Sequence, residues 1–545
     1  MHGAAHPTLL CLCAVPSGEA ALPIDDALAP HATPQGGATA GPCDALVINA
    51  QPSAPGKPCL HQRLALVATI LGSSMAFIDG SVVNVALSSI QTELGSSVAA
   101  MQWVVDAYLL LLGSLVLVGG AAGDRFGRRT VFIAGVALFT LASIACGFAP
   151  GSGTLIAARA VQGIGAALLV PGSLAIIGAV FDERDRGRAI GTWAGFGAIT
   201  GALGPVAGGW LVDVWSWRAI FFLNVPLACA TIALAAIAVP DSRNPNAQRS
   251  LDWPGALTAT AGLGAFTYGL TAASAHGFAA PVVFAPIALG IVLLIAFVML
   301  ERSRAEPMMP LDVFRSRDFT GANLVTLLLY FALGGLMFFL PFELIRAHGY
   351  SATEAGAALL PVPLILGLLS RFTGGLTTRF GMRALLVVGP FVSGIGLAML
   401  ALPGTHNLYW SRFFPALTVL GLGVTITVAP LTTVVMTAVP RDRTGIASGI
   451  NNAVARVASL LAIAVLGIVF VGAHDAALSA RVGRTNTEAS TDATVLTPDA
   501  TKSAAAQAAA IDRGFAAVVL VCAACAFAGA ICAAVTIGRK PVDAT

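Results

Sequence analysis

Charged residues are scarce in this sequence. Only 10% of its 545 residues are Asp, Glu, Lys or Arg, whereas an ordinary soluble domain carries about 25%. Hydrophobic residues make up 57% of the chain, and the mean hydropathy is +0.83. Such a chain cannot cover a water-facing surface of ordinary size, so we expect it to lie in a lipid bilayer. Its net charge of +3 gives no reason to expect a nucleic-acid partner.

The sequence also lacks the usual patterns of metal and catalytic sites. The eight His residues form no HExxH motif and no paired metal spacing. Cys522 and Cys525 form a CxxC motif, but it stands in an Ala-rich apolar run, which favours helix packing over a redox or zinc pair. In the segment 182–188 three acids alternate with three arginines, so a magnesium–diphosphate site would be neutralised by its own neighbours. We therefore expect no enzyme, no cofactor and no metal.

No Lys or Arg occurs in the first 56 residues. The run TLLCLCAV among them is short and lacks a basic flank, so it is a poor signal peptide. The Pro, Ala and Gly content predicts a disordered tail over residues 1–60. A start site assigned too far upstream would explain this stretch equally well.

Long apolar runs are abundant. A membrane helix needs about 20 mostly apolar residues, and the runs here are too long and too uniform for the strands of a β-barrel. We therefore predict an all-α membrane protein with fourteen transmembrane helices. The weakest prediction is the pair within 253–300, for which a single re-entrant unit is an alternative. The expected spans lie near 64–90, 101–122, 130–149, 154–180, 189–212, 218–239, 253–275, 281–300, 321–345, 353–378, 384–403, 412–438, 445–472 and 514–537.

Basic residues sort to one side of these helices. When the amino terminus is placed in the cytoplasm, most of the 30 Lys and Arg residues fall in the tails and inner loops. Cytoplasmic loops of membrane proteins carry this excess, and an odd number of helices would scramble the sorting. We expect an even number of helices, both termini in the cytoplasm, and location in the inner (plasma) membrane.

One loop sequence occurs twice. GAAGDRFGRR begins at Gly120 and GGLTTRFGMR begins at Gly374; both read G-x4-R-F-G-x-R and join two predicted helices on the inner side. Gly120 and Gly127 suit a sharp turn, and the neighbouring Arg128 and Arg129 suit anchoring at the cytoplasmic face. Two related halves that face one cavity are typical of transporters.

Three further stretches identify a family. FIDGSVVNVAL (77–87), LIAARAVQGIGAA (155–167) and GALGPVAGGW (201–210), together with the first loop, resemble the ordered motifs of the major facilitator superfamily, and within it of the fourteen-helix drug:proton antiporters. The resemblance covers about residues 64–540. It departs mildly at Ser81 and Ser88, where the family often has Thr and Pro.

The resemblance implies a domain plan. Two pseudo-symmetric six-helix halves are expected at 61–240 and 321–540, with two extra linker helices at 241–300. The segment 301–320 is then an amphipathic cytoplasmic linker whose apolar side chains face lipid, and 473–513 is a mobile, part-helical outer loop. Residues 541–545 form the carboxyl-terminal tail. The apolar side chains of the linker are Met309, Leu311, Val313 and Phe314.

The resemblance also assigns a role to the repeated loop. It implies that Asp124 and Arg125 join the two halves at an inner gate. Thr378 stands in place of the acid in the second copy, so such a latch would be one-sided. A plain basic anchor of the loop is the alternative.

The glycines of the fifth span form a second motif. Gly201, Gly204 and Gly208 share a helix face with Gly197, and such stripes let membrane helices approach closely. Pro205 permits a kink. The resemblance places this motif, including Gly209, between the halves and associates it with exporters; packing alone is the alternative.

Ionisable side chains within spans are expensive and usually functional. Asp79 is expected near the middle of the first span, where burial favours the neutral carboxyl group, so it would exchange protons and compete with a cationic substrate. A static ion pair, or an acid that lines a vestibule without titrating, is the alternative. Arg159 and Asp106 are expected at similar depth; the resemblance gives Arg159 a part in proton transfer, and a structural pair between them is the alternative. Asn84 follows Asp79 in the same motif.

Two residues of the second half complete the expected cavity. Arg456 lies near the middle of its span and is the best second-half charge to face the cavity. Glu343 lies near the outer end of its span, where it would either bind cations or serve as an interfacial acid.

These features predict a proton-coupled antiporter that exports amphipathic, cationic drugs or toxic compounds by alternating access. Its partners would be small-molecule substrates, protons and the lipid bilayer. Gly, Ala and Leu dominate the cavity helices, which fits a loose apolar cavity better than a sugar site. Transport of an endogenous metabolite on the same fold, by export or symport, is the alternative. Some exporters of this kind work with a periplasmic adaptor protein, and the sequence leaves open whether this chain does.

Overall fold

The computed structural model describes residues 60–243, 251–304, 307–402, 409–440, 443–489 and 500–538. Every regular element in these ranges is a helix, as the sequence predicts. The described residues all belong to one compact unit of the chain. The expected tail at 1–60 lies outside them except for its last residue, where the first helix begins.

The first half contains seven helices that make six candidate membrane spans. The short α6 is followed directly by α7, and the two form one span. The helices are α1 (Leu60–Leu94), α2 (Val98–Phe126), α3 (Arg128–Gly147), α4 (Ser152–Val180), α5 (Glu183–Val214), α6 (Ala219–Phe222) and α7 (Asn224–Ala238).

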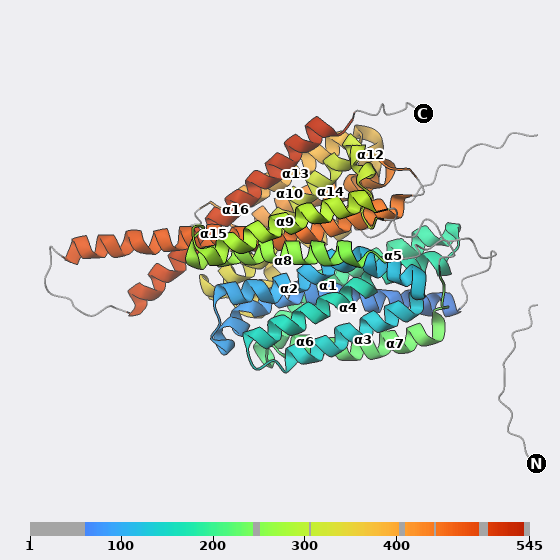
Figure 1. The fold of residues 1–545 in the computed structure, drawn as a ribbon. Helices are drawn as coiled ribbons and strands as arrows, with labels where there is room; N and C mark the ends of the chain where they lie inside the picture. The colour runs from blue at the N-terminus through green and yellow to red at the C-terminus, as the bar shows by residue number, and fades with distance from the viewer. Residues whose placement is uncertain are drawn as a thin grey trace, which may run out of the picture. The chain divides into compact units, whose positions relative to one another are not determined.

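The second half is built in the same way, and α11 and α12 together provide one of its six spans. A short 3-10 helix, η2 (Leu311–Arg315), precedes it. Its helices are α10 (Arg317–Arg346), α11 (Ala352–Ala358), α12 (Pro361–Phe380), α13 (Met382–Leu400), α14 (Phe413–Thr437), α15 (Thr444–Ala489) and α16 (Ala500–Thr536). Figure 1 shows α1–α7 in blue to green and α10–α16 in yellow to red.

Two further helices, α8 (Trp253–His276) and α9 (Pro281–Ser303), join the halves. They pack antiparallel, since the backbone at Gly262 meets Leu294 and that at Gly290 meets Phe266. They are two separate helices and not a re-entrant unit. Thirteen helical segments of the described chain, α9 among them, are apolar and long enough to span a bilayer, and α8 is a further long helix that is not among these thirteen. Its lower hydropathy reflects threonines such as Thr267 and Thr271, which are buried inside the protein.

Small residues bring the helices of each half close together. A side chain at Gly165 of α4 would meet the backbone of Phe139 in α3, and one at Gly396 of α13 would meet the backbone of Leu420 in α14. Lipid gives membrane helices no hydrophobic drive to associate, so their association depends on the packing energy of such close approaches. The scarcity of charge and the wealth of Gly and Ala therefore serve the same architecture.

The repeated loop occupies equivalent places in the two halves. Gly127 joins α2 to α3 with φ of 111°, and Gly381 joins α12 to α13 with φ of 77°. Both backbones lie in the region that disfavours side chains. In each case one glycine ends a helix and begins the next. The sequence repeat is thus a structural repeat.

Two segments differ from the expectations. Val313 is buried, and Met309 and Phe314 pack against a buried cluster that includes Phe319 and Val325 of α10, so the linker turns these apolar side chains into the protein and not towards lipid. The segment near 473–513 is mostly helical, because α15 and α16 run through it and leave only 490–499 outside the described residues. These helix ends extend beyond their neighbours (Figure 1).

Candidate functional site

A buried ion pair connects α1 to α4. The Arg159 Nη1 atom lies 2.5 Å from Oδ2 of Asp79, and both side chains are 1% exposed. Gln162, one turn after Arg159, donates from Nε2 to Oδ1 of Asp79 at 2.8 Å and accepts from Arg159 at 2.7 Å. The three side chains thus form a closed network in which both carboxylate oxygens of Asp79 are satisfied.

Helices α2 and α3 complete the surroundings of this network. The Arg159 Nε atom donates to the carbonyl of Val104 at 3.1 Å, and its guanidinium lies 4.3 Å from the centroid of the Tyr108 ring. The Cys146 sulfur donates to Gln162 at 3.7 Å. These contacts offset the cost of desolvating the two charges. In this conformation Asp79 faces the interior of the first half and does not line an open cavity.

Asp106 is not the partner of Arg159, contrary to the sequence-based alternative. Residues at 104 and 108 of α2 point toward Arg159, and position 106 lies on the other side of the same helix. Asp106 is fully buried, and neither of its oxygens has a hydrogen-bond partner among the described residues. The expected depth of a residue in the membrane could not show whether Asp79 or Asp106 pairs with Arg159. Depth alone does not tell which way a side chain points from its helix, or how far an arginine side chain reaches.

The face of α2 that carries Asp106 packs on α15 of the second half. Gln102 donates to the carbonyl of Ile463 at 3.0 Å, and a side chain at Gly113 would lie 3.0 Å from Cβ of Arg456. Asp106 lies between Gln102 and Gly113 on this face. Arg456 therefore lies where α2 and α15 of the two halves meet, and its expected position in a substrate cavity stays a prediction.

One face of α1 contacts the second half closely at one end and is open at the other. Leu87 and Gln91 lie against Phe338, Phe342 and Phe470 of the second half in a nearly closed apolar contact. One and two turns earlier on that face, Asn84 is half-buried and Gly80 has open space beside it. The halves thus meet firmly toward the carboxyl end of α1 and separate toward its amino end.

We call the side of the bundle at the carboxyl end of α1 the far end, and the side at its amino end the basic end. The basic end carries Arg125, Arg129, Arg315 and Arg379. At the far end Asp213 of α5 accepts hydrogen bonds from the backbone of Ala352 and Thr353, at 3.1 and 2.8 Å, and so caps α11. Arg346 donates to the carbonyl of Ser88 at 3.1 Å and to Thr92 of α1 at 2.7 Å. Each contact joins one half to the other.

The glycines of α5 lie at two interfaces, one with α1 of the same half and one with α11 of the second half. Gly197, Gly204 and Gly208 lie against α1 in their own half, at Phe77, Ser81 and Val82. The second half is approached by Gly209, which abuts the backbone of Ala352 and Thr353, and by the Pro205 carbonyl, which abuts Gly356. A side chain at Gly201 would meet nothing within 4 Å. The motif lies at the interface only near the far end.

The first copy of the repeated loop, between α2 and α3, is held within its own half in this conformation. Arg128 donates twice to Oδ1 of Asp124, at 3.0 and 2.9 Å, and its backbone bonds to Ser242 at 3.0 Å. Arg129 reaches the carbonyl of Val239 at the end of α7. Among the described residues the partner of Asp124 is therefore Arg128 of its own half, so the latch between the halves stays a prediction for another conformation.

An apolar cavity of about 290 Å³ lies between the halves on the side of the basic end. Its lining comes from α2, α8, α9, α10, α15 and the linker, and includes Leu117, Phe297, Met309, Phe314 and Val454. None of Asp79, Asn84, Glu343 and Arg456 lines it. The extra helices thus help to enclose an apolar compartment, which the sequence did not locate.

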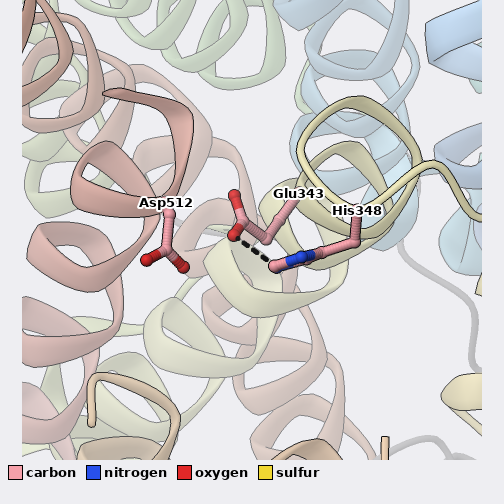
Figure 2. Close-up of side chains that lie close together, drawn as sticks. All are labelled: Glu343, His348 and Asp512. Atoms are coloured by element: carbon pink, nitrogen blue, oxygen red, sulfur yellow. Dashed lines mark ion pairs between the residues drawn. The ribbon is translucent and has the colours of Figure 1, made fainter. Parts of the chain in front are cut away.

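Glu343 lies at the far end of the bundle, near the carboxyl end of α10, and is 1% exposed. His348 and Asp512 are its neighbours (Figure 2). The sequence signalled neither of these, nor Asp213. Gln162 could have been found, because it stands three residues after Arg159 and so on the same face of α4.

Several known proteins are similar to this chain in sequence. The Major Facilitator Superfamily model matches residues 69–463. Multidrug resistance protein Stp of Mycobacterium tuberculosis is 35% identical over 424 residues, which are 78% of each chain. Puromycin resistance protein pur8 of Streptomyces alboniger is 36% identical over 421 residues, 76% of this chain and 83% of that protein. Methylenomycin A resistance protein of Bacillus subtilis is 35% identical over 406 residues, 74% of this chain and 86% of that protein.

Solved structures agree on the fold. A bacterial homologue of the human lysosomal transporter Spinster, in an inward-facing and unoccupied conformation, superposes with a TM-score of 0.60 at 17% identity over 88% of this chain and 98% of its own. A POT family transporter bound to a thioalcohol-conjugated peptide gives 0.59 at 12% identity, over 88% and 96%. The helical architecture, the repeated loop and the matched sequence lead to one conclusion: this chain is a multi-pass membrane transporter that belongs to the Major Facilitator Superfamily.

Proposed function

We propose that this transporter exports amphipathic, cationic drugs or antibiotics in exchange for protons. Buried carboxylates carry the proposal. Asp79 and Asp106 both lie inside the helix bundle with almost no exposure, and acids inside membrane spans are rarely retained without a function. Asp79 is paired and Asp106 is not, so the two can have different roles.

Asp106 is the group that we assign to proton binding in this conformation. Neither of its oxygens accepts a hydrogen bond from a described residue, and a buried carboxylate without a partner is far less costly when protonated. It lies where α2 packs on α15, so relative movement of the halves would change its access to water. Protonation of Asp106 can thereby depend on the transport cycle.

The ion pair of Asp79 and Arg159, inside the first half, would be affected when the two halves move relative to each other. The network around this ion pair links α1, α2 and α4, and Tyr108, whose ring packs on Arg159, stands only two residues after Asp106 on α2. Movement of α2 relative to α15 would therefore reach Arg159 directly. A proton taken up by Asp79 would release Arg159, which couples the network to proton flow.

Alternating access is supported by the unequal contacts at the two ends. The far end is joined by Asp213, Arg346 and the apolar contact around Phe338, while Gly80 and Gly201 face open space nearer the basic end. With the basic end in the cytoplasm, as the positive-inside rule favours, both termini are cytoplasmic and this conformation opens inward. Asn84, Arg456 and Glu343 remain proposed substrate contacts of the cycle.

The substrate class rests on relatives and on the apolar cavity. Relatives about 35% identical over three quarters of the chain are named for resistance to puromycin, methylenomycin A or several drugs. A cavity lined by Leu, Met, Phe and Val side chains suits apolar, loosely shaped molecules. Some relatives are named for export, including the Cephamycin export protein CmcT of Amycolatopsis lactamdurans, so an endogenous product remains the alternative substrate.

Transport by the purified chain in proteoliposomes tests the proposal. Vesicles with a pH-sensitive dye inside and an imposed pH gradient would be given puromycin, ethidium or neutral sugars. We expect the cationic compounds to dissipate the gradient and to be transported, and the sugars to do neither. Substrate flux without proton flux would contradict the coupling, and transport by the chain alone would show that no adaptor protein is required.

A further inference from the structure

Three ligand-type side chains converge at the far end of the second half. Glu343 is near the end of α10, His348 follows in the next turn, and Asp512 belongs to α16. One ligand atom from each lies within 4.8 Å of the other two. Figure 2 shows the carboxylates of Glu343 and Asp512 and the imidazole of His348 directed toward one another.

The buried polar atoms of this cluster, both carboxylate oxygens of Glu343 and Nε2 of His348, make no hydrogen bond of good geometry with a described residue. Glu343 is 1% exposed, and neither of its carboxylate oxygens accepts a hydrogen bond from a described residue. The Nε2 atom of His348 is likewise buried without one. It lies 3.2 Å from Oε1 of Glu343, as an ion pair when His348 is protonated (Figure 2), but without hydrogen-bond geometry. Buried polar groups are normally satisfied, and an unsatisfied carboxylate is costly, so this arrangement calls for a ligand.

The donor set fits a divalent transition metal. One imidazole nitrogen and two carboxylates match the ligands of zinc, which binds each at about 2.0–2.2 Å. Two such ligands of a tetrahedral ion lie ~3.3 Å apart, close to the 3.2 Å between Glu343 and His348. We propose that Glu343, His348 and Asp512 form a binding site for a zinc-like divalent metal ion. The fourth position would hold water.

Neighbouring residues hold the ligands in place and leave a way in. Arg412 donates to Oδ1 of Asp512 at 2.8 Å, which leaves Oδ2 available. The Phe413 ring lies 5.7 Å from the imidazole of His348, edge to face, and limits its rotation. Asp512 keeps 35% of its side chain exposed, so an ion can reach the cluster from water on this side.

Isothermal titration of the purified full-length protein with zinc sulfate tests this site directly. We expect one saturable site per chain in the wild type. His348→Ala and Glu343→Gln should each weaken binding more than tenfold. His474→Ala is the matched control, because His474 also lies beside an acid, 3.0 Å from Asp475, on α15 outside the cluster; it should bind zinc as the wild type does.

Other outcomes would overturn the proposal. Absence of saturable zinc binding to the wild type would show that the cluster holds only protons. Equal affinity of wild type and His348→Ala would place any bound zinc elsewhere. If His348→Ala does not stay folded, His348→Gln keeps a polar side chain of similar length, and its zinc-induced shift of the unfolding temperature replaces the titration. These measurements need no substrate, so their failure is distinct from failure of the proposed transport function.

Discussion

Arg159 lies 2.5 Å from Asp79 and holds it inside the first half, with Gln162 bound to both. The acid and the arginine that the sequence treats as separate candidates thus act as one unit. A change in the charge of either residue therefore changes the free energy of burying the charge of the other.

Asp79→Asn should abolish proton-driven export and also lower stability. The substitution leaves Arg159 buried without its counter-ion, which typically costs about 3–5 kcal/mol. The double variant Asp79→Asn/Arg159→Gln removes both charges and should recover much of the loss in thermal unfolding temperature, yet remain uncoupled. Coupled export by the folded double variant would remove Asp79 from the mechanism.

Asp106→Asn should have the opposite effect on stability. The wild-type carboxylate has no hydrogen-bond partner to lose in the part of the chain that the structure describes, so a neutral amide of the same size should leave the unfolding temperature unchanged or raise it. Proton movement during substrate flux should nevertheless fall sharply, because an amide cannot take up the proton. A dye measurement in proteoliposomes distinguishes these outcomes, and unchanged proton flux would contradict the role given to Asp106.

Gly209→Leu should open the far end. A side chain there would overlap the backbone of Ala352 and Thr353, so α5 and α11 must move apart. Gly201→Leu is the control in the same helix, because it meets nothing within 4 Å. Spin labels at the exposed positions Trp215 and Trp410 should move apart in the first variant only. Equal distances in both would show that the contact at Gly209 does not hold the halves together.

Asp124→Asn should keep membrane insertion and reduce transport. It weakens the two hydrogen bonds from Arg128 that fix the loop between α2 and α3, while the basic residues that anchor the loop remain. Surface labelling and transport can be measured on the same cells. Normal transport by a well-inserted variant would leave the loop with an anchoring role alone.

A smaller pH effect is expected at the linker. The hydrogen bond from Arg443 holds the pKa of Asp312 below its usual range. A lowered pKa in the folded state means that the pair stabilises the fold above the usual aspartate pKa and that this contribution disappears as pH falls through the lowered value. Both side chains are more than a third exposed, so Asp312→Asn should cost less than about 1 kcal/mol at neutral pH. Its unfolding temperature should approach that of the wild type in acid; a constant difference would contradict the pairing.

The sequence by itself determined the helical membrane fold, the two halves and the repeated loop, because apolar run length, scarce charge and glycine at Gly127 and Gly381 are local properties. It also marked Asp79, Arg159 and Asp106 as unusual, since charge within a span is visible in one dimension. Only the tertiary structure decided that Asp79 and not Asp106 meets Arg159, and that Gly209, which lies outside the glycine stripe of α5, abuts the second half. The physical reason is that partner choice depends on helix rotation and on which helices become neighbours. The cluster of Glu343, His348 and Asp512 makes the same point, because segments about 165 residues apart in the sequence meet there only through the packing of α10 on α16.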